Sequence, residues 1–535
     1  MGKMKQLWST WLLAVALTVS TNAQISQTAE HWNMPTVSAN ASSMDVISGF
    51  YYGWMDLNGD GFPDLIDTQD NTNTSSPWEK DGEYVWKIYM NTGTAINSVA
   101  EEWVVPDIAN DPANMNVVSG YTYGWLDLNG DGLPDLVDPR DNENTFDPWI
   151  DGRPYLKVYY NTGSSLNTTA AIWDMPQLTK NVEDANVLSA FYWGWYDMNN
   201  DGYIDLVDSQ DNDGDGAWLT ADDKPYWKVY LNDGTKLDTV NYIEWIIPEV
   251  ADDINNMDAI TASTYSLFDI NGDGYPDMVD AQQNGTNDVW EENGQRYWKV
   301  YLNDGSKFAT EAIHWALPNV TSSAANMDVV YASSYSWLDI NGDGIPDFID
   351  AQENGTNNVW TDGERRYWKV YLNDEQALST EAVEYDIPNV VTNASSMDLV
   401  FGSTFSWMDI NGDGTVDLID CQDNSSNAVW EENDQRYWKV YLNTAENLPT
   451  YTNNDLPISE ISVYPNPTAG IIQVQLYDDA KATISIYNGT GTQVYKTKEP
   501  VLQSFSYNLS HLPDGFYFVK VNCNNTETIT KVVKQ

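Results

Sequence analysis

A nine-residue pattern of oxygen-bearing side chains occurs six times in this chain of 535 residues. It reads D-x-N-x-D-G-x-x-D, as in Asp56–Asp64 (DLNGDGFPD), and successive copies begin 70 to 72 residues apart. Side-chain oxygens at positions 1, 3, 5 and 9, joined by the backbone carbonyl of position 7, form a set of hard donors without Cys or His. Such a set suits calcium better than zinc or copper, and Gly at position 6 allows the sharp turn. We therefore expect one Ca²⁺ in each copy, about six in all.

The predicted calcium ligands take the same five positions in every copy. An Asx/Gly turn that binds nothing is the alternative for any single copy, but six copies with one ligand pattern argue against it. The residues are Asp56, Asn58, Asp60, Phe62 and Asp64; Asp127, Asn129, Asp131, Leu133 and Asp135; Asp197, Asn199, Asp201, Tyr203 and Asp205; Asp269, Asn271, Asp273, Tyr275 and Asp277; Asp339, Asn341, Asp343, Ile345 and Asp347; Asp409, Asn411, Asp413, Thr415 and Asp417.

An acid also stands at position 12 of each copy, where two roles are open. It could ligate the ion, or it could pair across strands with a lysine that recurs later in the repeat, and the ion pair is slightly favoured. The acids are Asp67, Asp138, Asp208, Asp280, Asp350 and Asp420, and the lysines are Lys87, Lys157, Lys228, Lys299, Lys369 and Lys439.

The third repeat carries a further acidic stretch. Asp211, Asp213, Asp215 and Asp222 have the spacing of positions 1, 3, 5 and 12 of a loop, with Gly216 at position 6. A seventh calcium ion and a solvated acidic loop are equally good interpretations of this stretch.

The elements around each loop read as short β-strands. In the fifth repeat they are Ser334–Ile340, Asp347–Gln352, Tyr367–Asn373 and Ala382–Pro388, all rich in aromatic and β-branched residues and separated by Gly, Asn and Asp. The composition of the segment after each loop therefore predicts a strand, whereas the loop of an EF-hand is followed by a helix. Four antiparallel strands in each of six repeats predict an all-β fold, a six-bladed β-propeller.

Both ends of the array favour closure of a ring. Glu30–Pro35 (EHWNMP) matches a fourth strand, whereas the sixth repeat ends at Tyr437–Asn443, a third strand. We expect the N-terminal strand to complete the last blade. An open stack is the alternative, and it would leave two sheet edges exposed.

These motifs resemble the FG-GAP/VCBS family of calcium-binding propeller repeats, which occur in integrin α-subunit heads and in many secreted bacterial proteins. The resemblance covers residues 30 to 443. It implies ions that mainly support the fold, in keeping with a chain that has only two cysteines. Integrin-like heads have seven blades, whereas six repeats are counted here.

The two ends of the chain indicate export. Residues 1–23 read as a signal peptide, with Lys3 and Lys5 before an apolar run and small residues at the cut. No other stretch is long and apolar enough for a membrane helix. The 80 acids against 25 bases, concentrated before residue 460, disfavour nucleic acid as a partner.

The last part of the chain has a different character. Residues 24–443 form the predicted propeller, residues 444–459 a polar linker, and residues 460–535 a small Ig-like β-sandwich. Val463–Gly470 (VYPNPTAG) and Leu512–Val521 (LPDGFYFVKV) resemble the C-terminal sorting domain of the type IX (Por) secretion system. This resemblance implies contact with the type IX machinery, passage through the periplasm, and release or attachment at the outer cell surface.

Each repeat also carries a tryptophan in its long connection between the second and third strands. The six could stack on sugar rings as a multivalent lectin-like face, or each could pack the base of its own hairpin, the favoured interpretation. They are Trp78, Trp149, Trp218, Trp290, Trp360 and Trp430.

The function that these features favour is a calcium-binding surface or adhesion module for a glycan or a protein. A passive surface scaffold comes second. A propeller hydrolase or lyase comes third, because the chain has only three His and no nucleophile elbow, zinc motif or phosphate loop.

Overall fold

The computed structural model describes residues 23–443 and 461–534 with gaps. The gaps include parts of 38–50, 109–122, 179–191, 252–263, 319–333 and 391–403, the connections 71–75, 140–148, 151–152, 212–215, 284–287, 354–357 and 424–427, and short turns after residue 464. The predicted signal peptide up to residue 22 and the predicted linker lie outside the described residues. The chain divides into two compact units, residues 1–451 and 452–535.

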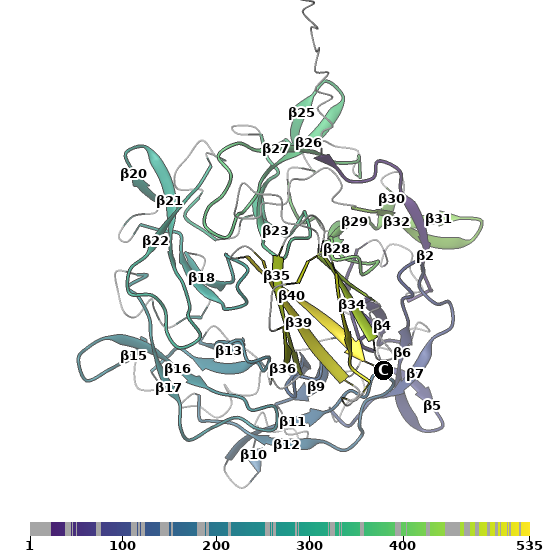
Figure 1. The fold of residues 1–535 in the computed structure, drawn as a ribbon. Helices are drawn as coiled ribbons and strands as arrows, with labels where there is room; N and C mark the ends of the chain where they lie inside the picture. Colours follow the sequence, from purple (N-terminus) through teal and green to yellow (C-terminus); the bar gives the residue numbers. More distant parts are fainter. Residues whose placement is uncertain are drawn as a thin grey trace, which may run out of the picture. The chain divides into compact units, whose positions relative to one another are not determined.

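The described residues form strands and no helix, which confirms the all-β prediction. In the first unit each repeat makes one antiparallel sheet, and the six sheets follow one another around the unit (Figure 1). Within a sheet the first strand pairs with the second, the second with the third and the third with the fourth. The third strand also extends outward to pair with a short strand that begins at or near the repeated tryptophan.

The strands of the six repeats have closely matching bounds. The first strands are β3 (Tyr52–Met55), β8 (Gly124–Leu126), β13 (Trp193–Tyr196), β18 (Tyr265–Phe268), β23 (Tyr335–Leu338) and β28 (Phe405–Met408); the second are β4 (Asp64–Asp67), β9 (Asp135–Asp138), β14 (Asp205–Asp208), β19 (Asp277–Asp280), β24 (Asp347–Asp350) and β29 (Asp417–Asp420). The hairpin strands are β5 (Trp78–Lys80), β10 (Trp149–Ile150), β15 (Trp218–Leu219), β20 (Trp290–Glu292), β25 (Trp360–Asp362) and β31 (Ala428–Glu432), the last paired with β30 (Gln422–Asp423).

The third strands are the longest in each repeat. They are β6 (Glu83–Tyr89), β11 (Arg153–Tyr159), β16 (Pro225–Tyr230), β21 (Gln295–Tyr301), β26 (Arg365–Tyr371) and β32 (Gln435–Tyr441). The fourth strands are β7 (Glu101–Val104), β12 (Ala171–Asp174), β17 (Ile243–Ile246), β22 (Ile313–Ala316) and β27 (Val383–Asp386).

The sixth repeat takes its fourth strand from the other end of the chain. Strand β2 (Glu30–Asn33) pairs antiparallel with β32, and Trp32 lies opposite Trp438. The pairing agrees with the strand position expected from Glu30–Pro35. Trp438 also donates its indole N–H to the carbonyl of Met44 at 3.0 Å, so the first and sixth repeats share a core.

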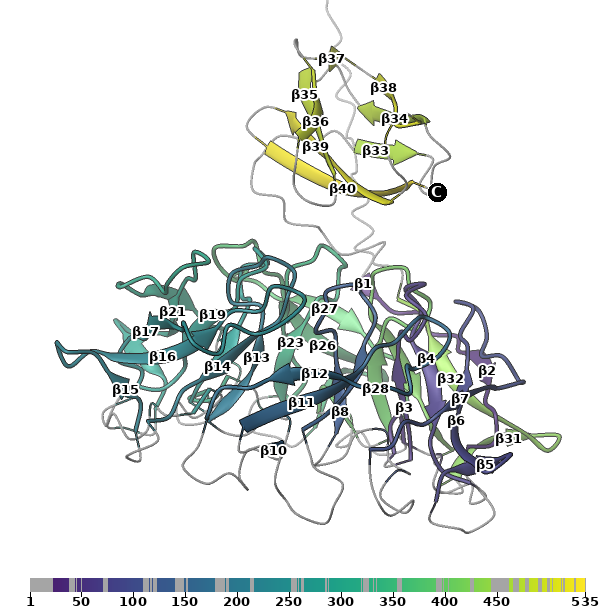
Figure 2. The same ribbon diagram turned by 90° about the horizontal axis from the view of Figure 1, so that it is seen from below.

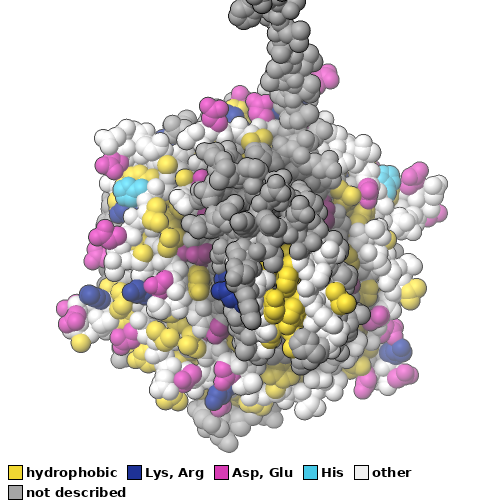
Figure 3. All heavy atoms as spheres, viewed as in Figure 1, with side chains coloured by type: hydrophobic (Ala, Val, Ile, Leu, Met, Phe, Trp, Pro, Cys, Tyr) yellow, Lys and Arg dark blue, Asp and Glu magenta, His cyan; other side chains and the backbone are white. Residues whose placement is uncertain are grey.

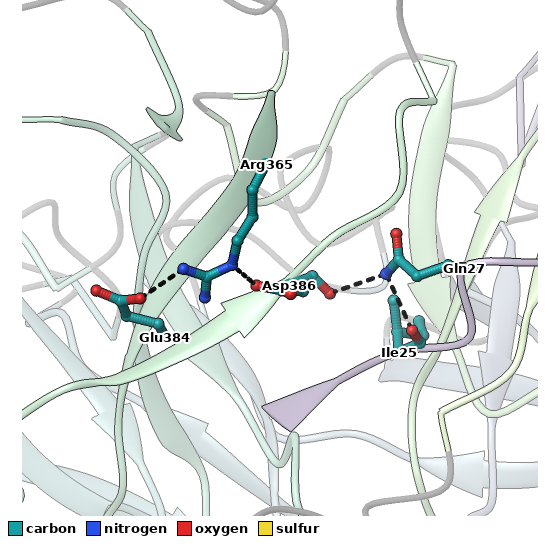
Figure 4. Close-up of polar contacts among 5 residues, drawn as sticks. All are labelled: Ile25, Gln27, Arg365, Glu384 and Asp386. Atoms are coloured by element: carbon teal, nitrogen blue, oxygen red, sulfur yellow. Dashed lines mark hydrogen bonds and ion pairs between the residues drawn. The ribbon is translucent and has the colours of Figure 1, made fainter. Parts of the chain in front are cut away.

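Residues just before β2 attach to the fifth repeat. Strand β1 (Ala23–Gln24) pairs in parallel with β27, and the Ile25 side chain is fully buried. The Gln27 amide donates to the carbonyls of Ile25 at 3.1 Å and Asp386 at 3.4 Å, while the Arg365 guanidinium contacts the Asp386 carboxylate (Figure 4). The N-terminal segment thus joins the fifth and sixth sheets.

The core of the first unit lies between neighbouring sheets. One cluster joins Trp86 and Trp103 of the first repeat to Tyr123 and Leu136 of the second. The second strands are buried along their whole length, acidic ends included. Because these strands are buried, the loops that precede them are held at fixed positions.

The second unit consists of two antiparallel sheets with one core (Figure 2). One contains β33 (Ile461–Tyr464), β34 (Ile471–Leu476) and β38 (Ser504–Asn508). The other contains β35 (Lys481–Asn488), β36 (Gln493–Lys496), β37 (Val501–Leu502), β39 (Gly515–Cys523) and β40 (Thr526–Lys534). In the described part of the chain we find no helix of the length and apolarity needed to cross a membrane.

Candidate metal centres

Each Asp loop connects the first and second strands of its repeat and folds around its own side chains. In the first loop Asp56 Oδ1 accepts the N–H of Gly59 at 2.7 Å, and its Oδ2 accepts that of Gly61 at 2.8 Å. Asn58 Oδ1 accepts the N–H of Asp60, and Asp60 Oδ1 accepts that of Phe62. The backbone therefore turns the side chains of positions 1, 3 and 5 inward. The bond from the position-6 N–H recurs in the other five loops, and so do the bonds accepted at positions 3 and 5. The bond from the position-4 N–H recurs in the fifth loop, from Gly342.

The aspartate at position 9 is buried in every repeat. In the first repeat Asp64 accepts the N–H of Asn91 at 2.8 Å. In four repeats the other carboxylate oxygen is buried without a hydrogen-bond partner; these are Asp135, Asp277, Asp347 and Asp417. A buried, half-satisfied carboxylate is costly unless a cation or a proton compensates it.

The charged groups that shift the pKa of the position-9 aspartate are other acids. Burial, together with the carboxylates of Asp60 and Asp56, raises the pKa of Asp64 to about 6. Burial likewise raises the pKa of Asp347 to about 8, again with help from the acids at positions 5 and 1. Three carboxylates thus gather at each loop, and a divalent cation would relieve their repulsion.

The donors present fit calcium. Positions 1, 5 and 9 supply carboxylates, position 3 an amide oxygen, and position 7 a carbonyl, all of which are ligands that Ca²⁺ accepts. No group of three or more His, Cys, Asp or Glu side chains in the described residues is already arranged to hold a metal ion. A loop would therefore draw its carboxylates together around the ion, with the amide and the carbonyl completing the shell.

The acids at position 12 have a different environment. Asp350 lies directly opposite Lys369 on the neighbouring strand, and the equivalent pairs face each other in all six repeats. In the second repeat Lys157 Nζ lies 3.6 Å from Asp138 Oδ2. Burial raises the pKa of Asp350 to about 8, and Lys369 acts in the opposite direction. The facing lysine favours an ion pair over metal ligation, with the contact within 4 Å seen in the second repeat. One carboxylate oxygen is nevertheless buried without a hydrogen-bond partner in Asp67, Asp208, Asp280, Asp350 and Asp420.

The repeated tryptophans cover these lysines. Lys87 Nζ lies 3.2 Å from the centre of the Trp78 ring, and the distances in the third, fourth, fifth and sixth repeats are 3.0 to 3.4 Å. A neighbouring tyrosine stacks beside the indole in three of them, as in Trp290 and Tyr297 at 6.4 Å. One face of each of these rings is therefore occupied within the protein. The side chain of Trp149 lies outside the described residues.

The extra acidic stretch of the third repeat is described only in part. The N–H of Asp211 donates to the carbonyl of Gly216 at 2.8 Å, which closes a turn, and Asp222 is exposed. Asp213 and Asp215 lie outside the described residues. A seventh calcium site stays a prediction.

One set of residues at the loops went unnoticed in the sequence. A buried asparagine follows each third strand and donates its N–H to the position-9 aspartate of its repeat. The six are Asn91, Asn161, Asn232, Asn303, Asn373 and Asn443. The signal was present as a Tyr-x-Asn in every repeat, but only a structure shows what this asparagine touches.

The face shown in Figure 3 carries acidic side chains scattered around its rim, with fewer basic ones between them. This distribution agrees with the excess of 80 acids over 25 bases in the sequence. Such a surface repels polyanions.

Comparison with known proteins gives one assignment. Residues 462–535 match the family described as a secretion system C-terminal sorting domain. The second unit is a sorting domain. It implies interaction with the type IX secretion system and a protein that is secreted or held at the outer cell surface. No curated protein matches the chain.

Similar solved structures carry no further conclusion. They include a DUF3244 family protein with an immunoglobulin-like β-sandwich fold from Bacteroides vulgatus (15% identity, 14% of this chain and 83% of that chain, TM-score 0.13). A fungal alcohol oxidase of the AA5 family in complex with copper covers 95% of this chain and 100% of its own, at 10% identity and a TM-score of 0.28. A glycoside hydrolase family 32 protein from Bifidobacterium adolescentis covers 90% and 75%, at 10% identity and a TM-score of 0.23.

Proposed function

We propose that residues 24–443 form a closed six-bladed β-propeller of the FG-GAP/VCBS type whose six loops bind calcium. The pairing of β2 with β32 and the shared core of the first and sixth repeats support closure. The observation that carries calcium binding is the buried position-9 aspartate, which stands beside two further carboxylates in each loop.

The propeller would serve as a binding or adhesion module for a glycan or protein outside the cell. The sorting domain supports the location. Six repeats also present equivalent side chains side by side, which is what multivalent binding requires. In this proposal calcium stabilises a module whose chain has only two cysteines, because an ion that binds only the folded state stabilises that state.

Thermal unfolding of the chain from Gln24 onward tests the calcium part. The protein is stripped with EDTA, and calcium or magnesium is then titrated back while the bound ions are counted by calorimetry. We expect calcium to raise the melting temperature by at least about 10 °C, because each filled site adds up to about 4 kcal/mol at saturating ion. Magnesium should do much less, since it demands a tighter octahedral shell. An unchanged melting curve would contradict calcium binding.

The binding role has its own test. The calcium-loaded protein is applied to arrays of glycans and of extracellular matrix proteins, with the EDTA-treated protein as the control. Retention that disappears in EDTA is the expected result. Absence of any retention by the loaded protein would leave a passive surface scaffold as the better description.

A further inference from the structure

Neighbouring Asp loops are linked through the six buried asparagines. Asn232 donates its backbone N–H to Asp205 Oδ1 in its own repeat at 2.9 Å, and its side-chain amide donates to the carbonyl of Leu128 in the preceding loop at 2.8 Å. Leu128 is position 2 of that loop. One residue therefore holds the position-9 ligand of one loop and the backbone of another.

The same link occurs at every junction between consecutive repeats. The side-chain amides of Asn161, Asn232, Asn303, Asn373 and Asn443 reach the carbonyls of Leu57, Leu128, Met198, Ile270 and Ile340 at 2.7 to 3.0 Å. Asn91 of the first repeat reaches Ile410 of the sixth at 2.8 Å. The six links thus include the junction between the two ends of the array.

A second contact joins the loops directly. The position-7 side chain of one loop packs on the position-4 glycine of the preceding loop, so that a Cβ on Gly130 would lie 2.6 Å from the Tyr203 ring. Phe62 meets Gly412 in the same way across the ends of the array. In the third loop Asn200 replaces the glycine, and its amide donates to the carbonyl of Asp273 at 3.2 Å.

We propose that these contacts couple the six loops, so that calcium binds to them cooperatively and the asparagines act as positioning residues for the ions. The inference rests on the proposed function, in which the loops bind calcium. An ion draws in the position-9 carboxylate and the position-7 carbonyl of its loop. The carboxylate is bonded to the asparagine that reaches the preceding loop, and the position-7 side chain packs on that loop, so filling one site orders part of the next.

Cooperative binding has a consequence for regulation. Sites that fill independently respond to calcium over a wide concentration range, whereas coupled sites fill over a narrow one. The stability of the first unit would then rise steeply at a threshold calcium concentration.

Calcium titration calorimetry on the chain from Gln24 onward tests the coupling. Asn161→Leu and Asn232→Leu keep the branched shape of the side chain but remove the amide that reaches the preceding loop. Asn241→Ala is the matched control, because this exposed asparagine donates its side-chain amide only to Asp238 of its own connection. Tyr203→Ala removes the second contact without altering any asparagine and without adding a side chain to Gly130, whose φ of 67° a side chain would strain.

For the unchanged protein we expect a Hill coefficient of about 2 or more, the upper limit being the number of sites. Each Leu variant and Tyr203→Ala should lower this coefficient and weaken the mean calcium affinity by about 5- to 20-fold, with the number of bound ions nearly unchanged. The control should match the unchanged protein. Should a Leu variant fail to fold, Tyr203→Ala still decides the question.

Two contrary outcomes can be told apart. If the unchanged protein binds several ions with a Hill coefficient near one, the coupling is overturned while calcium binding stands. If the unchanged protein binds no calcium, the proposed function fails and the coupling fails with it.

Discussion

Every repeat buries two aspartates three residues apart on its second strand, and their surroundings differ. In β24 Asp347, at the loop end, accepts the N–H of Asn373 and stands near the carboxylates of Asp339 and Asp343. At the other end Asp350 faces Lys369, whose ammonium lies 3.4 Å from the centre of the Trp360 ring. The first site gathers negative charge, whereas the second contains its own counter-ion.

The difference shows which of the two buried aspartates needs a proton or an ion from solution. A buried charge must be compensated by a partner, a proton or an ion. At position 12 the lysine, with a tryptophan over it, lowers the pKa of the aspartate and so compensates part of its charge from within the chain, although burial still raises the pKa of Asp350 to about 8. At position 9 the strongest electrostatic neighbours are other acids, so a proton or a cation from solution has to supply it.

The largest expected effect that sharpens this contrast is the pH dependence of stability without calcium. Burial raises the pKa of Asp64 to about 6 and that of Asp277 and Asp347 to about 8, whereas in the unfolded chain these groups titrate near their ordinary value. The folded state therefore holds more protons between about pH 4 and 8. Its stability should fall as pH rises through this range, by up to about 1.4 kcal/mol per pH unit for each such group.

Melting temperatures from pH 5 to pH 9, in EDTA and in excess calcium, check this prediction. In calcium the slope should flatten, because the ion replaces the proton at position 9 and only the position-12 acids continue to titrate. A melting temperature in EDTA that rises toward pH 9 would contradict the sign.

A smaller effect should separate the two aspartates of one strand. In calcium we expect Asp347→Asn to lower the free energy of unfolding by about 3 kcal/mol, the stabilisation from one ion at about 100 times its dissociation constant. In EDTA the same change should raise the free energy of unfolding, since it removes a buried uncompensated charge.

Asp350→Asn is the matched variant. It leaves the Lys369 ammonium without its acid, and should cost about 3 kcal/mol in calcium and in EDTA alike. Urea unfolding of both variants under both conditions makes the comparison. Equal responses of the two variants to calcium would show that the sites do not differ as described.

The sequence predicted local features well because they repeat. The Asp loop, the strand that begins at its position 9, and the fourth strand at Glu30–Pro35 all follow from residue types with short spacing, and β4 and β2 lie where these patterns place them. The cross-strand pair of Asp350 and Lys369 could also be weighed in advance, since both residues recur at fixed offsets.

Apart from the pairing of β2 with β32, contacts between distant residues were beyond such reasoning. The amide of Asn91 reaches Ile410, and β1 adds to β27 in parallel, although nothing in either local sequence names the partner. The lysine over each tryptophan belongs to the same class, because the side-chain direction in a hairpin depends on its register. The sequence contains these residues, but only the fold shows which residues they contact.

The smallest expected effect concerns that tryptophan. Trp360→Leu removes the ring from Lys369 but keeps the Asp350 pair, so it should lower the free energy of unfolding by about 1 kcal/mol, equally with and without calcium. Since one face of the ring is already occupied, we expect glycan retention by the loaded protein to survive this change. If Trp360→Leu instead abolishes glycan retention while stability is unchanged, the tryptophans belong to the binding surface. The hairpins would then take part in ligand binding.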